Sequence, residues 1–136
     1  MLTLTLLSPE RKLVEGLQIQ SLMLTGSEGL IQILPDHAEM IGTLETGPFS
    51  YVPVSGDTVS GFISTGFFEI KGHQVILMAE TCELSKEIDV SRAKAAQKRA
   101  ENALSDPELD NSLFRKYELK LQRALIRQQV VGRDLH

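Results

Sequence analysis

The stretch ETCELSKEIDVSRAKAAQKRA, residues 80–100, decides the fold because the chain changes character within it. Nine of the ten glycines and four of the five prolines lie in residues 1–72. From residue 87 onward the chain is rich in Ala, Arg and Lys, with one glycine and one proline. Glycine and proline mark turns between short strands, whereas Ala, Arg, Lys and Gln favour helix. The sequence therefore predicts a strand-rich domain at residues 1–84 followed by a helical domain at residues 85–136.

The strand-rich part contains short apolar runs between turn signals. Leu2, Leu4 and Leu6 alternate with threonine, a pattern typical of a half-buried strand. The sequence Lys71-Gly72-His73 stands between two apolar runs and predicts a tight hairpin connection. Eight to ten short strands with frequent turns are expected, which predicts a β-sandwich or flattened barrel. Further strands are expected around 17–19, 20–24, 31–34, 40–44, 51–54, 58–63, 66–70 and 74–80.

The helical part has the signals of two helices with a break between them. Asp89 is a suitable N-cap, and alanines after it recur at three- and four-residue spacing on one helix face. Pro107 ends this pattern and suits the first turn of a second helix. We expect helices at about 89–104 and 108–131, which form an antiparallel two-helix hairpin.

The two parts carry opposite charge. Residues 1–84 have three Lys and Arg against ten Asp and Glu, a net charge of −7. Residues 85–136 have eleven against eight, a net charge of +3, and the whole chain carries −4. The acidic part argues against nucleic-acid binding. The basic part can meet an acidic partner, a nucleotide or the acidic part of the same chain.

Cysteine usage and hydropathy limit the cellular compartments in which the protein is expected. Cys82 is the only cysteine, so no internal disulfide can form, and a reducing compartment fits. The first seven residues lack the charged start and apolar block of a signal peptide. The longest unbroken apolar run, Val75–Ala79, is far shorter than the ~20 residues of a membrane helix. We expect a protein that is neither secreted nor membrane-spanning.

The common catalytic and metal-binding patterns do not occur in this sequence. It has no phosphate-binding Gly-rich loop and no strand–elbow serine motif. His37, His73 and His136 stand singly, without ligand-like spacing to one another or to Cys82. We expect Cys82 to be buried and inert because it follows an apolar strand. The sequence predicts no catalytic residues, no metal site and no required cofactor.

Seven short segments occur in order over nearly the whole chain. They are SPE (8–10), TGSEG (25–29), ILPDHA (33–38), LETG (44–47), STGFFEI (64–70), VILMAETCE (75–83) and EIDVSRA (87–93). Together they resemble the epsilon subunit of the rotary F-type ATP synthase. The resemblance implies an N-terminal β-sandwich and a C-terminal two-helix hairpin.

The resemblance also implies a function without catalysis. In that family the sandwich sits at the foot of the central stalk, clamps the gamma subunit and rests on the membrane c-ring. The hairpin folds down on the sandwich or extends toward the alpha and beta subunits, where it restrains ATP hydrolysis. A peripheral protein is implied, on the cytoplasmic face of a bacterial inner membrane or the equivalent face of an organelle membrane.

The segment Gly29–Ala38 departs from the family pattern. By spacing alone it is an ordinary strand and turn. The resemblance implies that Leu30, Asp36 and His37 lie at the edge facing the c-ring. The family usually has glycine in place of Asp36, often glycine in place of Gln32, and often an acidic residue in place of Leu30. Glycine allows unusual backbone angles that Asp tolerates in part and Gln less well.

Arginines of the two helices are expected to meet when the hairpin folds. With a turn near Asp106, Arg92 faces about residue 121, and Arg123 and Arg127 lie four apart on one face of the second helix. Three guanidinium groups repel one another unless an anion joins them, and a triphosphate is suitable. They can instead pair with carboxylates of the sandwich or of the beta subunit.

The resemblance implies a regulatory ATP site in this region. Ile-Asp-x-x-Arg-Ala, two arginines of the second helix and a glutamate at the end of the sandwich form an ATP-binding pattern in some bacterial members. The corresponding residues are Glu83, Ile88, Asp89, Arg92, Ala93, Arg123 and Arg127. By spacing alone, Asp89 and Arg92 are a helix cap and a solvated side chain.

Three classes of function remain to be weighed. The first is a regulatory subunit that associates with the gamma, alpha and beta subunits and the c-ring. The second is a free-standing β-sandwich binding module with a helical dimerisation hairpin, which would form a homo-oligomer. The third, an enzyme, is disfavoured because no catalytic set is present.

Overall fold

Nine strands form from residues 2–84 of the computed structural model, which describes residues 1–134 of the chain, without the side chains of 133 and 134. The strands are β1 (Leu2–Leu7), β2 (Lys12–Gly26), β3 (Gly29–Ile33), β4 (Met40–Leu44), β5 (Gly47–Pro53), β6 (Val59–Ile63), β7 (Gly66–Lys71), β8 (Gln74–Ala79) and β9 (Cys82–Leu84). The strand-rich prediction is confirmed. The expectation of separate strands at 17–19 and 20–24 is wrong, because no turn residue interrupts β2 there and a register shift between Ile19 and Ser21 accommodates the bend.

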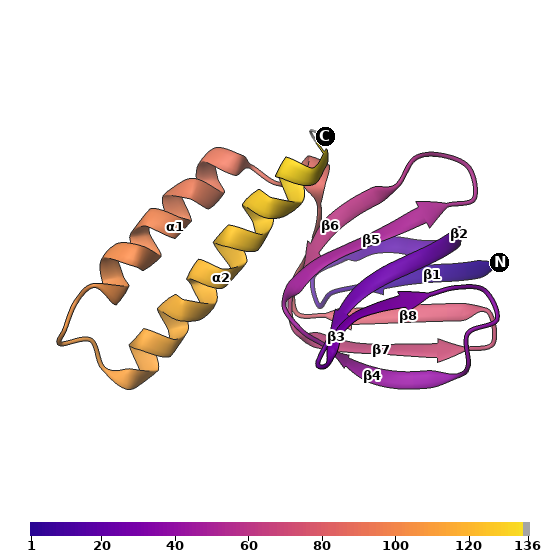
Figure 1. Ribbon diagram of the computed structural model, residues 1–136, viewed down its shortest axis with the longest axis horizontal. Helices are drawn as coiled ribbons and strands as arrows, with labels where there is room; N and C mark the ends of the chain where they lie inside the picture. Colours follow the sequence, from indigo (N-terminus) through magenta and orange to yellow (C-terminus); the bar gives the residue numbers. More distant parts are fainter. Residues whose placement is uncertain (135–136) are drawn as a thin grey trace.

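The long strand β2 joins the layers of a sandwich (Figure 1). Strands β8, β7 and β4 lie in one layer, and β3, β2, β5, β6 and β9 in the other. Strand β1 pairs in parallel with β8 and antiparallel with β2. Every other pairing in the sandwich is antiparallel within the described residues.

The core of the sandwich comes from side chains that alternate inward along the strands. Leu4, Leu24 and Leu77 are fully buried between the layers, and Phe49 and Phe68 are almost so. Every residue of this core lies between Leu2 and Leu84, and none of the described helix residues belongs to it. The core of the sandwich is therefore built without side chains of the hairpin.

A short 3-10 turn, η1 (Ser85–Glu87), leads from β9 to two helices, α1 (Val90–Leu104) and α2 (Asn111–Asp134). The predicted cap of the first helix is confirmed, since Asp89 Oδ1 accepts a hydrogen bond from the Arg92 amide at 3.1 Å. The prediction that the second helix begins near residue 108 is wrong. Asp110 caps it by accepting from the Leu113 amide at 2.9 Å, and the preceding residues form a turn. In the part of the chain that the structure describes, neither helix is both long and apolar enough to cross a membrane.

The hairpin lies against one side of the sandwich (Figure 1). Helix α2 contacts β5, β6 and η1, and α1 packs on its far side. Ala93, Ala100 and Ala124 are buried where the helices meet. The small side chains let the helices pack closely but bury little apolar area. Leu113, in the first turn of α2, is 40 % exposed.

The turn after β3 holds an unusual backbone conformation. Asp36 has φ +72°, in the left-handed region, and it is the only described non-glycine residue with positive φ. This explains why glycine suits the position, and Asp is among the residues that tolerate it best. Gln32 has no such angle, because it pairs with Met23 inside the β2–β3 ladder.

We expect Asp36→Gly to raise the free energy of unfolding by about 1 kcal/mol, because glycine enters the left-handed region without steric cost. Gly72 has φ +61° and open space around an added Cβ, so Gly72→Asp should lower that free energy by a similar amount. Urea unfolding of both variants checks the pair. A fall in stability for Asp36→Gly would contradict the backbone explanation.

Candidate functional site

A cleft of about 610 Å³ lies between the two helices and the β9–η1 connection. Its volume falls within the range of about 300–1,000 Å³ that is usual for small-molecule sites. The seven residues predicted to lie together all line it: Glu83, Ile88, Asp89, Arg92, Ala93, Arg123 and Arg127. Folding of the hairpin thus brings the whole predicted set to one place. The remaining lining residues are Glu87, Ala96, Arg99, Ala100, Tyr117 and Lys120.

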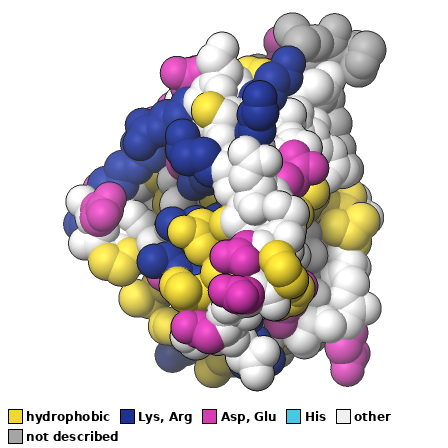
Figure 2. All heavy atoms as spheres, turned by 90° about the vertical axis from the view of Figure 1, so that its left-hand side faces the viewer, with side chains coloured by type: hydrophobic (Ala, Val, Ile, Leu, Met, Phe, Trp, Pro, Cys, Tyr) yellow, Lys and Arg dark blue, Asp and Glu magenta, His cyan; other side chains and the backbone are white. Residues whose placement is uncertain are grey.

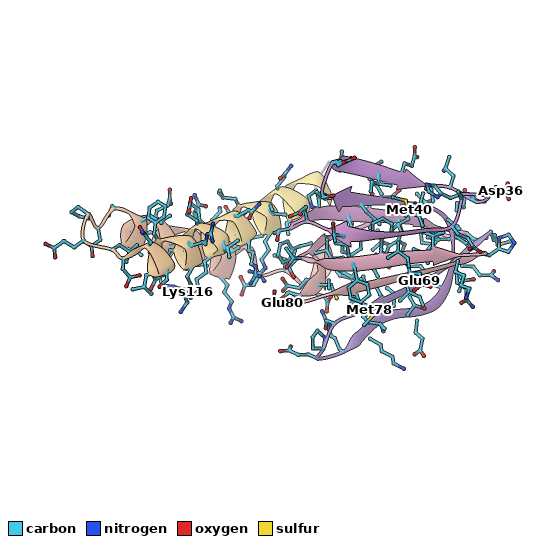
Figure 3. All side chains as sticks on the ribbon, turned by 90° about the horizontal axis from the view of Figure 1, so that it is seen from below. Asp36, Met40, Glu69, Met78, Glu80 and Lys116 are labelled. Carbon is cyan, nitrogen blue, oxygen red and sulfur yellow. The ribbon has the colours of Figure 1, made fainter. Side chains whose placement is uncertain are left out.

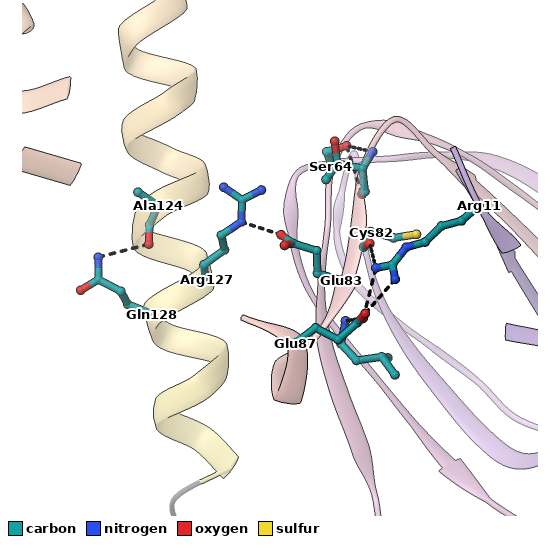
Figure 4. Close-up of polar contacts among 10 residues, drawn as sticks. Arg11, Ser64, Cys82, Glu83, Glu87, Ala124, Arg127 and Gln128 are labelled. Carbon is teal, nitrogen blue, oxygen red and sulfur yellow. Dashed lines mark hydrogen bonds and ion pairs between the residues drawn. The ribbon is translucent and has the colours of Figure 1, made fainter. Parts of the chain in front are cut away.

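The sandwich contributes Glu83 of β9 to this cleft, beside the place where α2 docks on β6. Phe62 and Glu83 are cross-strand partners there, and Phe62 is fully buried although it is not part of the sandwich core. Arg127 of α2 lies over the Phe62 ring at 4.7 Å from its centroid. Its Nε donates to Glu83 Oε1 at 2.6 Å (Figure 4). A charge-assisted hydrogen bond and a cation–π contact therefore hold α2 on the sandwich.

Arg123, one turn earlier, is less well satisfied. Its Nη2 is 3.5 Å from Glu80 Oε2, a long contact to a side chain that is 64 % exposed. Its Nε is buried and has no hydrogen-bond partner among the described residues. A buried donor without an acceptor costs about 1–3 kcal/mol, so Arg123 stabilises the docked hairpin less than Arg127 does.

The cleft carries an excess of positive charge. Five cationic side chains line it (Arg92, Arg99, Lys120, Arg123 and Arg127) against three carboxylates (Glu83, Glu87 and Asp89). Within residues 1–134 the guanidinium groups of Arg92 and Arg99 make no hydrogen bond or ion pair. Figure 2, a view from the hairpin side, shows Lys and Arg side chains gathered on this face. The arrangement can bind an anion with several acceptor oxygens.

Glu87 at the edge of the cleft is held from outside it by Arg11. Arg11 Nη1 lies 2.7 Å from Glu87 Oε2, and Nη2 lies 3.1 Å from Glu87 Oε1. The same Nη2 donates to the Cys82 carbonyl oxygen at 3.1 Å, and Glu87 Oε1 accepts from the Leu84 amide at 2.9 Å (Figure 4). Hydrogen bonds from Arg11 lower the pKa of Glu87 and raise that of the guanidinium itself.

Cys82 lies beside this pair and faces the sandwich core. It is 3 % exposed, and burial raises the pKa of its thiol. A buried thiol with a raised pKa is a poor nucleophile. No group of three His, Cys, Asp or Glu side chains that could hold a metal ion occurs in the described residues.

The other three predicted site residues lie apart from the cleft and do not form one cluster. Leu30 is near the start of β3 and is 68 % exposed. Asp36 and His37 lie in the turn beyond the end of that strand, where His37 Nδ1 is 2.9 Å from the Ala38 carbonyl oxygen. Figure 3 places Asp36 at the end of the sandwich opposite to the hairpin.

Several residues of the site were missed from the sequence. Arg99 follows Arg92 by two helical turns and lies on the same helix face, so helical spacing could have identified it. Arg11 and Glu80 carry no such signal, because their partners Glu87 and Arg123 are 76 and 43 residues away in the chain.

Comparison with known proteins finds a matching family for each of the two domains. Residues 1–85 match the family described as ATP synthase, Delta/Epsilon chain, beta-sandwich domain, and residues 86–132 match its long alpha-helix domain. The chain is 38 % identical over 130 residues to the ATP synthase epsilon chain of Trichlorobacter lovleyi, covering 96 % of this chain and 93 % of the relative. It is 36 % identical to that of Clostridium kluyveri, covering 93 % of each.

Solved structures share the fold at low sequence identity. A chain of the Euglena gracilis mitochondrial ATP synthase, in a structure of OSCP, F1 and c-ring, has a TM-score of 0.82 at 19 % identity. That match covers 99 % of this chain and 81 % of the Euglena chain. A chain of the Tetrahymena thermophila enzyme, from its central stalk and c-ring, has a TM-score of 0.59 at 13 % identity and covers 99 % and 96 %.

The Arg11–Glu87 pair predicts a specific acid sensitivity. Arg11 lowers the pKa of Glu87 below its ordinary value of 4.5, so the pair stabilises the fold above about that pH. This contribution is lost as the pH falls through the folded-state pKa. We expect Arg11→Ala to lose less stability than the unsubstituted chain between about pH 5 and about pH 3 in urea unfolding.

Lys12→Ala is the matched control for this measurement, because Lys12 is the next residue, at the start of β2, and among the described residues its ammonium group pairs only with the exposed Glu15 at 3.4 Å. It should keep the acid dependence of the unsubstituted chain. Identical pH profiles for Arg11→Ala and the unsubstituted chain would refute the assignment.

Proposed function

Because the chain belongs to the ATP synthase delta/epsilon chain family, we propose that it couples gamma to the c-ring and restrains ATP hydrolysis through a nucleotide-sensitive hairpin. The resemblance to the F-type epsilon subunit is confirmed, and so is the predicted fold of a β-sandwich followed by a helical hairpin. The chain is thus an epsilon-type member of this family. In the proposal it belongs to the central stalk of an ATP synthase complex and associates peripherally with an energy-converting membrane.

The observation that carries the nucleotide part of the proposal is the convergence of all seven motif residues on one cationic cleft. A triphosphate would supply the acceptor oxygens that the Arg92 guanidinium lacks. Arg92 comes from α1, whereas Arg123 and Arg127 come from α2. An anion held by both helices would therefore stabilise the folded hairpin. In this proposal ATP is a regulatory ligand and takes part in no reaction on this chain.

The energy scale of the hairpin contact suits such regulation. The helices meet through alanine side chains, and each buried methyl group contributes only about 0.8 kcal/mol. A ligand at a hundred times its Kd adds about 2.7 kcal/mol to the state that binds it. The two terms are of similar size, so nucleotide can shift the hairpin between folded and extended forms.

A second surface supports the proposed contact with gamma. On the outer face of β4, β7 and β8, Ile41, Phe67 and Met78 are 75 %, 48 % and 41 % exposed. Phe67 and Met78 are direct cross-strand partners, and Thr43 and Leu7 extend their row. Apolar side chains gathered on one sheet face favour a protein partner. Figure 3 shows Met78 on this face, with Glu80 beyond it toward the hairpin.

The proposed contact with the c-ring uses the end of the sandwich remote from the hairpin. Asp36 lies at that end (Figure 3) and His37 follows it, whereas the exposed Leu30 lies near the opposite end of β3. The cationic face of α2 suits an acidic surface of alpha or beta when the hairpin extends. We propose that the chain has a non-catalytic role and lies on the cytoplasmic side of the membrane or its equivalent.

The alternative of a dimerisation hairpin finds less support. Helices α1 and α2 already bury their alanine faces against each other within one chain. Family membership also favours a subunit of a larger complex over a free-standing module.

The nucleotide site is tested by isothermal titration of ATP into the chain and two variants. We expect Arg92→Ala to raise the Kd for ATP by about tenfold or more, since a charge-assisted hydrogen bond contributes about 1.5–3 kcal/mol. Lys94→Ala removes the same charge from an exposed position of α1 outside the cleft and should change the Kd little. Absence of binding at millimolar ATP, or equal weakening by both substitutions, would exclude the site.

The regulatory role is tested with a chain that ends at Glu87. This chain keeps the complete sandwich core and the Arg11–Glu87 pair. Reconstituted with the other subunits, it should assemble and support proton-driven ATP synthesis, while the ATP hydrolysis rate exceeds that of complexes with the full chain. An unchanged hydrolysis rate would rule out restraint by the hairpin.

A further inference from the structure

We propose that Arg11 is a positioning residue of the anion cleft, which it serves by holding the Glu87 carboxylate away from the bound anion. This inference rests on the proposed nucleotide site and adds to it a residue from the opposite end of the chain. Arg11 belongs to the turn between β1 and β2 and does not line the cleft. Its influence therefore passes through Glu87.

The contact is built to hold one carboxylate orientation. Both terminal nitrogens of Arg11 meet both oxygens of Glu87, at 2.7 and 3.1 Å. The Cys82 carbonyl fixes the guanidinium, and the Leu84 amide fixes Glu87 Oε1. Bidentate pairs of this kind are stronger and more directional than single contacts. Glu87 therefore has a fixed orientation at the edge of the cleft.

The charges that line the cleft explain why the orientation of Glu87 matters. Of the three carboxylates that line the cleft, Glu83 is paired with Arg127, and Asp89 accepts from the Arg92 amide at the start of α1. Glu87 is the carboxylate that is neutralised by a cation from outside the cleft. Without Arg11, its charge would repel a phosphate group or would pair with a cleft arginine that the anion needs. The unpaired cations at Arg92 and Arg99 stay available because Arg11 occupies Glu87.

A purely structural role makes a different prediction. If Arg11 served only to attach η1 to the sandwich, loss of either partner would disturb the cleft equally, and loss of both would not restore it. If Arg11 serves to neutralise Glu87, removal of the Glu87 charge should rescue the loss of Arg11. Glu87→Gln suits this test, because the amide oxygen can still accept from the Leu84 amide.

The experiment is a double-mutant cycle read by isothermal titration of tripolyphosphate and, separately, of ATP. The proteins are the full chain, Arg11→Ala, Glu87→Gln and the double variant, with Lys12→Ala, a change at the next residue, as the matched control. We expect Arg11→Ala to raise the Kd for both anions by about tenfold and Glu87→Gln to lower it. The double variant should return to within about threefold of the full chain, and Lys12→Ala should match the full chain.

Each outcome decides the proposal. An unchanged Kd in Arg11→Ala, or a double variant as weak as Arg11→Ala, overturns it. If tripolyphosphate binds and shows the rescue while ATP does not bind, the inference holds and the nucleotide part of the proposed function fails. If ATP binds normally to Arg11→Ala, the proposed function stands and the inference fails. If neither anion binds to the full chain, the inference and the nucleotide part of the proposed function both fail.

Discussion

Docking of the hairpin on the sandwich depends on the position of Phe62. Its ring points away from the sandwich core and is fully buried, with Arg127 of α2 above it. Glu83 lies beside it on the neighbouring strand and binds the same arginine. Burial of a phenylalanine side chain stabilises by about 1.5–3 kcal/mol. A hairpin that leaves the sandwich must therefore expose this ring and break the ion pair at the same time. Docking of the hairpin is thus a cooperative event at one defined position on the sandwich.

The other contacts of the docked hairpin are weaker than those of Phe62 and Arg127. Alanines between α1 and α2 give a close but weakly apolar interface, and Arg123 makes only a long contact to Glu80. The cations of the cleft are incompletely neutralised, so the folded hairpin keeps a positive electrostatic potential there. The firm anchor defines where the hairpin docks, while the weaker surroundings leave its stability open to adjustment by a ligand. Arg11 contributes by holding the Glu87 carboxylate, which would otherwise neutralise part of the positive charge of the cleft.

Local sequence signals predicted the features that depend on local physics. The Asp89 cap and the hairpin follow from residues within one or two helical turns. The start of α2 was misplaced because Pro107 and Asp110 both suit a helix start, and the choice between them depends on the turn that precedes the helix. Convergence of Arg92, Arg123 and Arg127 could be predicted once a hairpin was assumed. The Arg11–Glu87 pair could not, because only the tertiary fold joins residues 76 positions apart.

The confinement of the sandwich core to residues before the hairpin has a consequence for synthesis on the ribosome. Strand β1 is made first, but its parallel partner β8 follows some seventy residues later, so the sandwich cannot close until Gln74–Ala79 has emerged. Once β9 is complete, every core residue is present. Folding in the order of synthesis would then complete the structural unit while the helices are still being translated. The hairpin would dock last, onto a finished surface, so sequence changes in the helices could alter how the hairpin docks without disturbing the core of the sandwich.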